Sequence, residues 1–270
     1  LSKYYADSPS GVAPKTAELI NKVELNKSKQ IMFSLICSLV FLIVFCLPLF
    51  QLIYWQLSES SINLLNNINL LINSLILGFA VGIFTIFFAA ALSLSFRQSS
   101  KLRLLISIST SGYAIPGSVI SAGLLIGFDA VFGTSITIYG IFGLILCLSF
   151  RFMTPAYNYS SSSLANISKS SENALSLVPS NPLKAFSSFY YPQMKSALFL
   201  GFMIVFIESV KEQAATLLLR PVGFDTLSTK IYNFTSEGEW EMAASPSLLL
   251  IFLSLAFVYL INKNIDLNTK

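Results

Sequence analysis

Three charged residues lie close together inside an apolar segment near the end of the chain. The stretch FIESVKEQAATLLLRP contains Glu208, Lys211 and Glu212. Ionisable groups inside a membrane are costly, and they usually pair with one another or face a cavity. On a continuous helix Glu208 and Glu212 share one face, because they are four residues apart. This face predicts a cation pathway or its outer gate; the alternative is a Glu208–Lys211 pair that only neutralises itself.

The composition indicates an integral membrane protein and disfavours an enzyme. Of the 270 residues, 54% are hydrophobic and 11% are charged, whereas soluble domains have about a quarter charged. The chain has no histidine, and Cys37, Cys46 and Cys147 lie in apolar runs without metal or redox spacing. Zinc, haem and Ser/His/Asp chemistry therefore lack their usual residues. No GxxxxGK[ST] nucleotide loop is present either, and we predict no cofactor.

Six segments are long and apolar enough to cross a bilayer, which requires about 20 residues. An open sheet is excluded, because its edge would be unsatisfied in lipid. The sequence therefore predicts an all-α polytopic bundle of six transmembrane helices over residues 31–262, between a linker or tail (1–30) and a short tail (263–270). The predicted spans are Ile31–Trp55, Ile68–Phe96, Leu104–Phe128, Ile136–Met153, Met194–Leu219 and Met242–Ile261.

The distribution of lysine and arginine predicts the orientation of the bundle. With six spans both termini lie on one side of the membrane, and the side richer in Lys and Arg is cytoplasmic. We therefore expect both termini in the cytoplasm. The cytoplasmic set includes Lys22, Lys27, Arg97, Arg103, Arg151, Lys169, Lys184 and Lys263, whereas the opposite side carries mainly acids, among them Asp225, Glu237, Glu239 and Glu241.

A long cytoplasmic loop separates the fourth and fifth predicted spans, over about residues 156–195. It is much longer than most connections in helical bundles. Ser170 or Ser171 could cap a helix that runs through Glu172 and Leu175. Pro182 could start a second short helix. Two short amphipathic helices outside the membrane predict a docking surface, with a passive connection as the alternative.

The third predicted span contains the motif GYAIPGS, which predicts an irregular helix. Pro116 removes a backbone hydrogen bond, while Gly112 and Gly117 permit close helix approach or local unwinding on either side of Tyr113. Freed carbonyls at membrane depth are tolerated only where they face protein or water. We therefore expect this segment to line a pathway; packing of small residues is the alternative.

Three stretches resemble the permeases of binding-protein-dependent ABC importers. The cytoplasmic loop resembles their "EAA" loop, with Glu172, Asn173 and Ala174 in the first three places and Pro192 as the closing proline. Asn173 and Val178 depart from the expected Ala and Gly. The stretches GYAIPGSVISAGLL and KEQAATLLLRPVGFDTLSTKIY resemble the third-span and fifth-span motifs of the ferric-iron branch of these permeases.

The resemblance implies the partners and the role of the loop. It implies a coupling helix that seats on a cytoplasmic ABC ATPase dimer, with Glu172 paired to a basic group of that ATPase. It also implies a periplasmic substrate-binding protein at the outer loop and a location in the bacterial inner membrane. ATP hydrolysis would belong to the separate ATPase, and no nucleic acid is involved. The expected coupling residues are Glu172, Ala174, Leu175, Leu177 and Pro182, and the expected pathway residues are Gly112, Tyr113, Pro116, Gly117, Glu208 and Glu212.

The resemblance also suggests that the chain is the C-terminal half of a fused two-half permease, with residues 1–30 as the linker. A second permease half is then a further partner, besides membrane lipid. Two alternatives remain open at this stage. The cargo could be thiamine, a phosphonate or a polyamine. Less favoured is a gradient-driven secondary transporter, in which Glu208 and Glu212 would bind a coupling ion.

Overall fold

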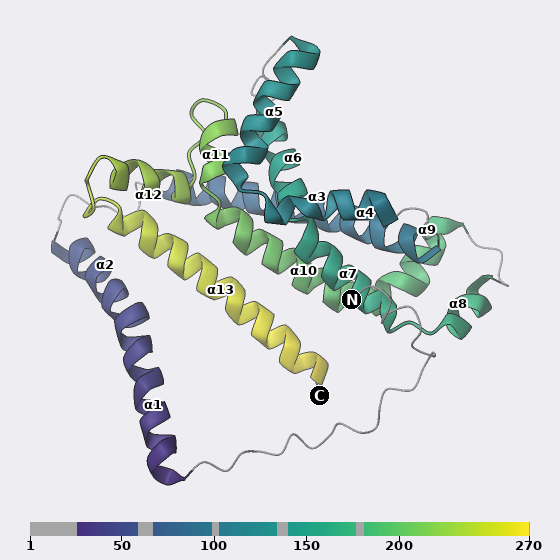
Figure 1. Ribbon diagram of the computed structural model, residues 1–270, viewed down its shortest axis with the longest axis horizontal. Coiled ribbons are helices and arrows are strands. Elements are labelled where there is room, and N and C mark those ends of the chain that lie inside the picture. Colours follow the sequence, from purple (N-terminus) through teal and green to yellow (C-terminus); the bar gives the residue numbers. More distant parts are fainter. Residues whose placement is uncertain (1–25, 59–66, 99–102, 134–139, 177–180, 270) are drawn as a thin grey trace.

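The computed structural model describes residues 26–58, 67–98, 103–133, 140–176 and 181–269, and every regular element in these ranges is a helix (Figure 1). Four helices are long and apolar enough to cross a membrane, and two sharply bent helix pairs bring the number to six if each pair is one span. The predicted all-α membrane bundle is confirmed. The helices are α1 (Lys27–Phe41), η1 (Leu42–Cys46), α2 (Leu47–Ser58), α3 (Ile68–Gln98), α4 (Arg103–Ser109), η4 (Ser111–Ala114), α5 (Gly117–Phe132), α6 (Ile141–Arg151), α7 (Met153–Ala165), α8 (Lys169–Ser176), α9 (Pro182–Ala185), η6 (Phe186–Tyr190), α10 (Tyr191–Lys211), α11 (Ala214–Leu219), α12 (Leu227–Ser236) and α13 (Ala244–Thr269).

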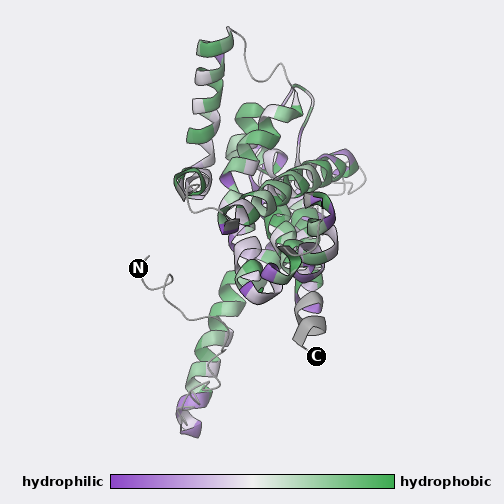
Figure 2. Ribbon diagram, turned by 90° about the vertical axis from the view of Figure 1, so that its right-hand side faces the viewer, coloured by the Kyte–Doolittle hydropathy of each residue, from purple (hydrophilic) through white to green (hydrophobic). Residues whose placement is uncertain are grey.

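The first span, α1–η1–α2, lies at the edge of the bundle. None of its most apolar window is buried, and α2 packs against α13 (Figure 1). Side chains such as Leu35, Val44 and Phe50 are 64%, 70% and 71% exposed. Hydrophobic residues cover most of the helices (Figure 2). Apolar exposure on this scale fits contact with lipid, since soluble monomers rarely expose large contiguous apolar patches.

The core of the bundle forms where α3, α7 and α10 pack against one another, with α6 and α11 beside them. Glycines let α3 and α10 approach closely: a Cβ at Gly78 would lie 2.7 Å from the Phe206 ring, and one at Gly82 would lie 2.6 Å from Phe202. Small residues at helix contacts are the usual means of close packing in membranes. Phe206 also stacks on Phe257 of α13, with ring centroids 3.9 Å apart.

Two of the predicted spans are bent helix pairs. The predicted third span changes direction by 118° between η4 and α5, where Ile115 is extended and Pro116 precedes the first residue of α5. Proline has no N–H to continue a helix, so this break follows directly from the sequence. The expected irregularity at Pro116 is confirmed. The fourth span bends by 54° at Phe152, between α6 and α7.

The predicted end of the fourth span was wrong. It was placed at Met153, but α7 continues to Ala165 and packs against α3 and α10. The polar serine run in α7 misled the hydropathy argument. Ser160 is fully buried and its hydroxyl lies 2.6 Å from that of Ser93 in α3, so these polar side chains satisfy each other inside the bundle.

The connection between the fourth and fifth spans is correspondingly shorter than predicted. Pro182 does begin a helix, but α9 continues through η6 into α10, so the second short helix is the N-terminal part of the fifth span. This span ends at Lys211 rather than Leu219. In α8 the capping serine is Ser168, whose Oγ accepts from the Ser171 N–H at 3.2 Å, rather than Ser170 or Ser171.

Candidate functional site

An ion pair between Arg151 and Glu212 lies where the broken helices meet. Arg151 Nε is 3.4 Å from Glu212 Oε2, and the two side chains are only 22% and 11% exposed. Arg151 Nη1 also donates to the Ile115 carbonyl at 3.1 Å. That carbonyl lies at the break of the third span, so the arginine satisfies one of the groups that the break sets free.

Each of the three helix breaks contributes to this ion pair. Arg151 ends α6 at the bend of the fourth span, and Ile115 belongs to the break of the third. Glu212 follows the last residue of α10, and its Oε1 accepts from the Ala215 N–H of α11 at 3.3 Å. A Cβ at Gly117 would lie 2.5 Å from Glu212 Oε1, so glycine is needed for this approach. The pair therefore connects three spans at the points where their helices are interrupted.

The expectation that Glu208 and Glu212 share a helix face was wrong. The α10 helix ends at Lys211, and Glu212 has extended backbone dihedrals, φ −73° and ψ 118°. The Glu212 carbonyl accepts hydrogen bonds from the hydroxyls of Thr216 and Ser228, which stabilise the non-helical backbone at this position. The two carboxylates consequently point to different partners.

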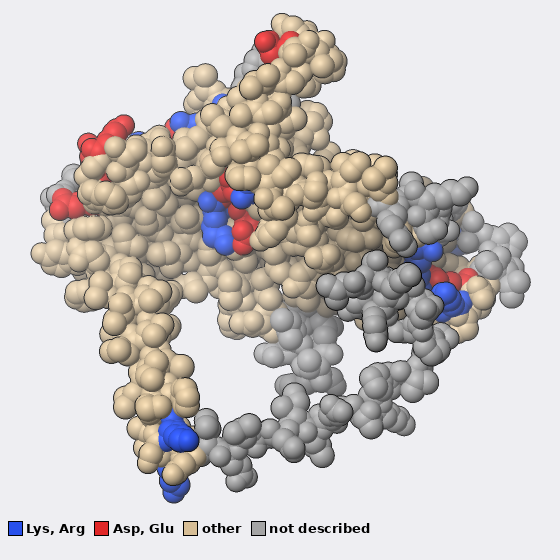
Figure 3. All heavy atoms as spheres, viewed as in Figure 1, with Lys and Arg blue, Asp and Glu red and all other residues tan. Residues whose placement is uncertain are grey.

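Glu208 pairs with Lys211 on the same helix. The Lys211 Nζ lies 2.9 Å from Glu208 Oε1, and the side chains are 45% and 36% exposed. Basic and acidic residues lie together near the middle of one face, surrounded by uncharged atoms (Figure 3). The self-neutralising pair considered from the sequence is therefore present. Both side chains of the pair remain partly exposed.

The GYAIPGS residues lie beside this ion pair but face different surroundings. Gly112 and Gly117 are buried, whereas Tyr113 is 53% exposed and Pro116 is also exposed. A Cβ at Gly112 would lie 2.5 Å from the Phe150 carbonyl of α6. Both glycines thus serve close packing around the break, and Tyr113 and Pro116 lie on its outer surface.

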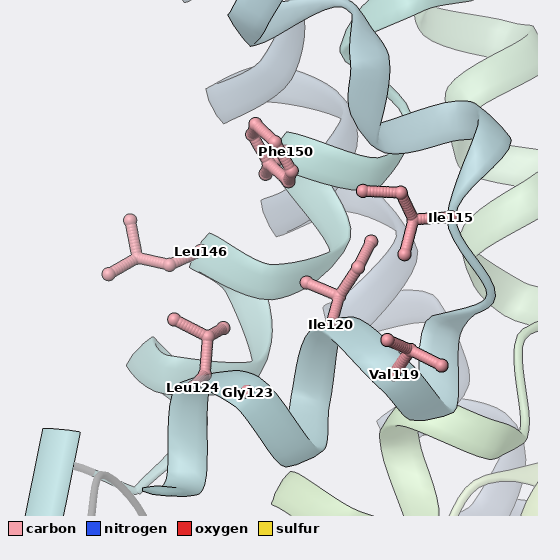
Figure 4. Close-up of a pocket in the computed structure, with 7 residues that line it drawn as sticks. All are labelled: Ile115, Val119, Ile120, Gly123, Leu124, Leu146 and Phe150. Carbon is pink, nitrogen blue, oxygen red and sulfur yellow. The ribbon is translucent and has the colours of Figure 1, made fainter. Parts of the chain in front are cut away.

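A pocket of about 460 Å³ lies between α5 and α6, next to the break (Figure 4). Its lining is entirely apolar and offers no ligand for a metal ion. No group of three or more His, Cys, Asp or Glu residues in the described part of the chain could hold a metal. The lining residues are Ile115, Val119, Ile120, Gly123, Leu124, Leu146 and Phe150.

The predicted coupling residues lie at the opposite end of the bundle from the Arg151–Glu212 pair. Glu172 of α8 is half-buried and pairs with Arg97 of the same chain, with Nε 2.5 Å from Oε1. Ala174 is exposed and Leu175 half-buried. Pro182 begins α9, and Leu177 lies outside the described residues.

Sequence reasoning did not identify the two arginines that organise these regions. Arg151 lies inside the predicted fourth span, but the sequence analysis uses it only as one of the basic residues near the cytoplasmic side. A partner for the buried Glu212 could have been sought among the cations inside apolar segments, and Arg151 is one of these. Arg97 was counted only toward orientation, although its position at the end of α3 places it beside α8.

Comparison with solved structures defines the fold. The chain matches a structure of the MetNI methionine ABC transporter in an inward-facing conformation, with a TM-score of 0.60. The match covers 75% of this chain and 96% of that chain, at 16% identity. The chain has the fold of an ABC-transporter permease.

The curated proteins that this chain resembles are permeases of iron transport. It is 26% identical over 233 residues to the Fe(3+)-transport system permease protein FbpB 2 of Haemophilus influenzae, across 84% of this chain and 46% of that protein. It is 28% identical over 124 residues to the ferric transport system permease protein FbpB of Actinobacillus pleuropneumoniae, across 45% of this chain and 18% of that protein. The chain thus spans less than half of the length of these relatives, and no family model matches it. The resemblance to ferric ABC permeases is confirmed.

Proposed function

We propose that the chain is one half of the membrane channel of an ATP-driven importer, which moves ferric iron from a periplasmic binding protein across the bacterial inner membrane. The similarity to an Fe(3+) permease over 84% of the chain carries this proposal. A second permease half completes the channel, and a separate ATPase dimer supplies the energy. Arg151 is paired inside the bundle and no longer counts toward the Lys and Arg residues that predict orientation. Most of the other basic residues still lie on the side of the termini, so we propose that both termini are cytoplasmic.

The pairing of the carboxylates favours this mechanism over a gradient-driven transporter. A coupling-ion site needs a carboxylate free to bind a proton or a sodium ion. Glu208 and Glu212 each have a cationic partner within 3.4 Å. The partly exposed Glu208–Lys211 pair then borders the cation path, and the Arg151–Glu212 pair holds its broken helices together.

Reconstitution tests the class and the cargo together. The full-length protein is placed in liposomes with its ATPase and its binding protein, and ATP hydrolysis is measured with the binding protein empty and then ferric-loaded. Stimulation by the ferric form is expected. Stimulation only by another ligand, such as thiamine or methionine, would retain the class and replace the cargo. Transport without any ATPase would overturn the class.

Glu208→Gln is expected to lower ferric transport several-fold while leaving folding unchanged. The charge is partly exposed, and such pairs contribute about 0–1 kcal/mol to stability. The loss would arise because Lys211 then presents an unbalanced positive charge to the cation. Uptake of radioactive iron, compared with the melting temperature of the same sample, measures both. In Glu208→Gln/Lys211→Gln the transport is expected to recover in part, and unchanged transport in both variants would exclude this pair from the path.

A further inference from the structure

Arg97 contacts three groups at the inner end of the bundle, one in α7, one in the α7–α8 connection and one in α8. Its Nε lies 2.5 Å from Glu172 Oε1 in α8. Its Nη2 donates to the Ile167 carbonyl at 2.6 Å, and its Nη1 donates to the Leu164 carbonyl. The side chains of Arg97 and Glu172 are only 21% and 19% exposed, so the contact is mostly sheltered from water.

The chemistry of these acceptors explains why an arginine occupies this position. The α7 helix ends at Ala165, and the last carbonyls of a helix lack intrahelical partners and carry partial negative charge. The Leu164 and Ile167 carbonyls lie at this end. A guanidinium offers five donors in a fixed fork, so one side chain can serve two carbonyls and a carboxylate together.

The fifth span also reaches this contact. Tyr190 of η6 donates its hydroxyl to Glu172 Oε1 at 3.4 Å. Tyr190 also packs against an apolar cluster of Leu164, Ile167 and Met194. The α8 helix is thus connected through Glu172 to the inner ends of the second, fourth and fifth spans.

The remaining face of α8 is turned away from the bundle. Lys169, Ser170 and Ala174 are exposed, whereas Glu172 and Leu175 are half-buried. The carboxylate that the family resemblance assigns to an ATPase contact is therefore already engaged by Arg97 of its own chain. The small exposed residues are the ones available to a partner.

We infer that Arg97 and Glu172 form a latch that fixes the coupling helix α8 to the inner ends of α3, α7 and η6. Within the proposed function, on which this inference rests, Glu172 is a positioning residue for α8 and the exposed face of α8 meets the ATPase. Displacement of α8 by the ATPase is passed through the latch to α3 and α7. Both helices pack against α10, which leads to Glu208 and Glu212 at the far end of the bundle.

The test compares Arg97→Gln, Glu172→Gln and the double variant in the reconstituted full-length complex. The readouts are ATPase retention in a pull-down and ATP hydrolysis stimulated by the ferric-loaded binding protein. Each single variant is expected to keep the ATPase bound and to lose about tenfold in stimulation, within the range of ordinary allosteric coupling. The double variant is expected to be no worse than either single one, because both remove the same contact. Lys184→Gln, which neutralises an exposed cation on the same side, is the control.

Two further outcomes separate the latch from its alternatives. If Glu172→Gln releases the ATPase while Arg97→Gln does not, Glu172 contacts the ATPase and the latch is wrong. Additive losses in the double variant would also contradict it. Arg97→Lys keeps the positive charge but loses the forked guanidinium donors, so it should retain the ATPase and show intermediate stimulation. This variant replaces the glutamine variants in the test if those fail to fold. A wild-type protein that binds no ATPase would instead overturn the proposed function.

Discussion

Arg151→Gln and Glu212→Gln are each expected to destabilise the protein by about 3 kcal/mol, whereas the double variant should be much less damaging. Removing one partner of a buried ion pair typically costs about 3–5 kcal/mol, because the remaining charge loses its compensation. The lower end applies here, since Arg151 remains 22% exposed. In the double variant neither buried charge remains. The apparent melting temperature of the purified protein in detergent, followed by size-exclusion chromatography, measures the difference.

The second ion pair of the region provides the control for this experiment. Glu208 and Lys211 are more exposed, so neutralising either is expected to shift the melting temperature little. If the Arg151 and Glu212 losses simply add in the double variant, the two side chains do not stabilise each other. The same result would remove the reason for treating the three helix breaks as one connected unit.

The helix breaks differ in how far the sequence predicted them. Pro116 has no N–H, Gly117 follows it directly and Gly112 precedes it by four residues. Local chemistry therefore predicts the break of the third span. The break after Lys211 was not, because the residues around Glu212 have no strong helix breaker. It depends on Thr216 and Ser228 hydroxyls that reach the Glu212 carbonyl, and on the Arg151 partner. Such tertiary contacts leave no periodic signal in the sequence.

For the connection between the fourth and fifth spans, the sequence predicted a loop where the structure has a helix. The serine-rich residues of α7 were assigned to solvent because of their polarity, but Ser160 is buried against Ser93. A hydroxyl inside a membrane bundle is inexpensive once it has a partner, and hydropathy does not include that partner. The family motif predicted a short helix around Glu172, and the structure has this residue in α8, where it pairs with Arg97. The motif could not reveal that Arg97, 75 positions away, faces it.

The second large effect that we expect is a loss of stability on substitution of Gly112, which lies in η4 next to α6. Gly112→Ala should lower the stability by about 1–3 kcal/mol, the usual cost of overpacking a tight contact. The added Cβ would lie 2.5 Å from the Phe150 carbonyl, and a backbone atom of α6 cannot move aside as a side-chain tip can. Separation of η4 from α6 would also draw the Ile115 carbonyl away from Arg151. Transport should therefore fall along with the melting temperature.

Gly127→Ala is the matched control for this substitution. Gly127 lies in α5, and a Cβ there would meet nothing within 4 Å. Alanine is favoured over glycine inside a helix by about 1 kcal/mol, so this variant should be neutral or slightly more stable. Melting temperature and ferric uptake are measured on both variants under the same conditions. Equal losses of melting temperature and uptake in both variants would mean that backbone flexibility of the glycines, rather than the contact with α6, is required. A loss confined to Gly112→Ala identifies the contact with α6 as the requirement.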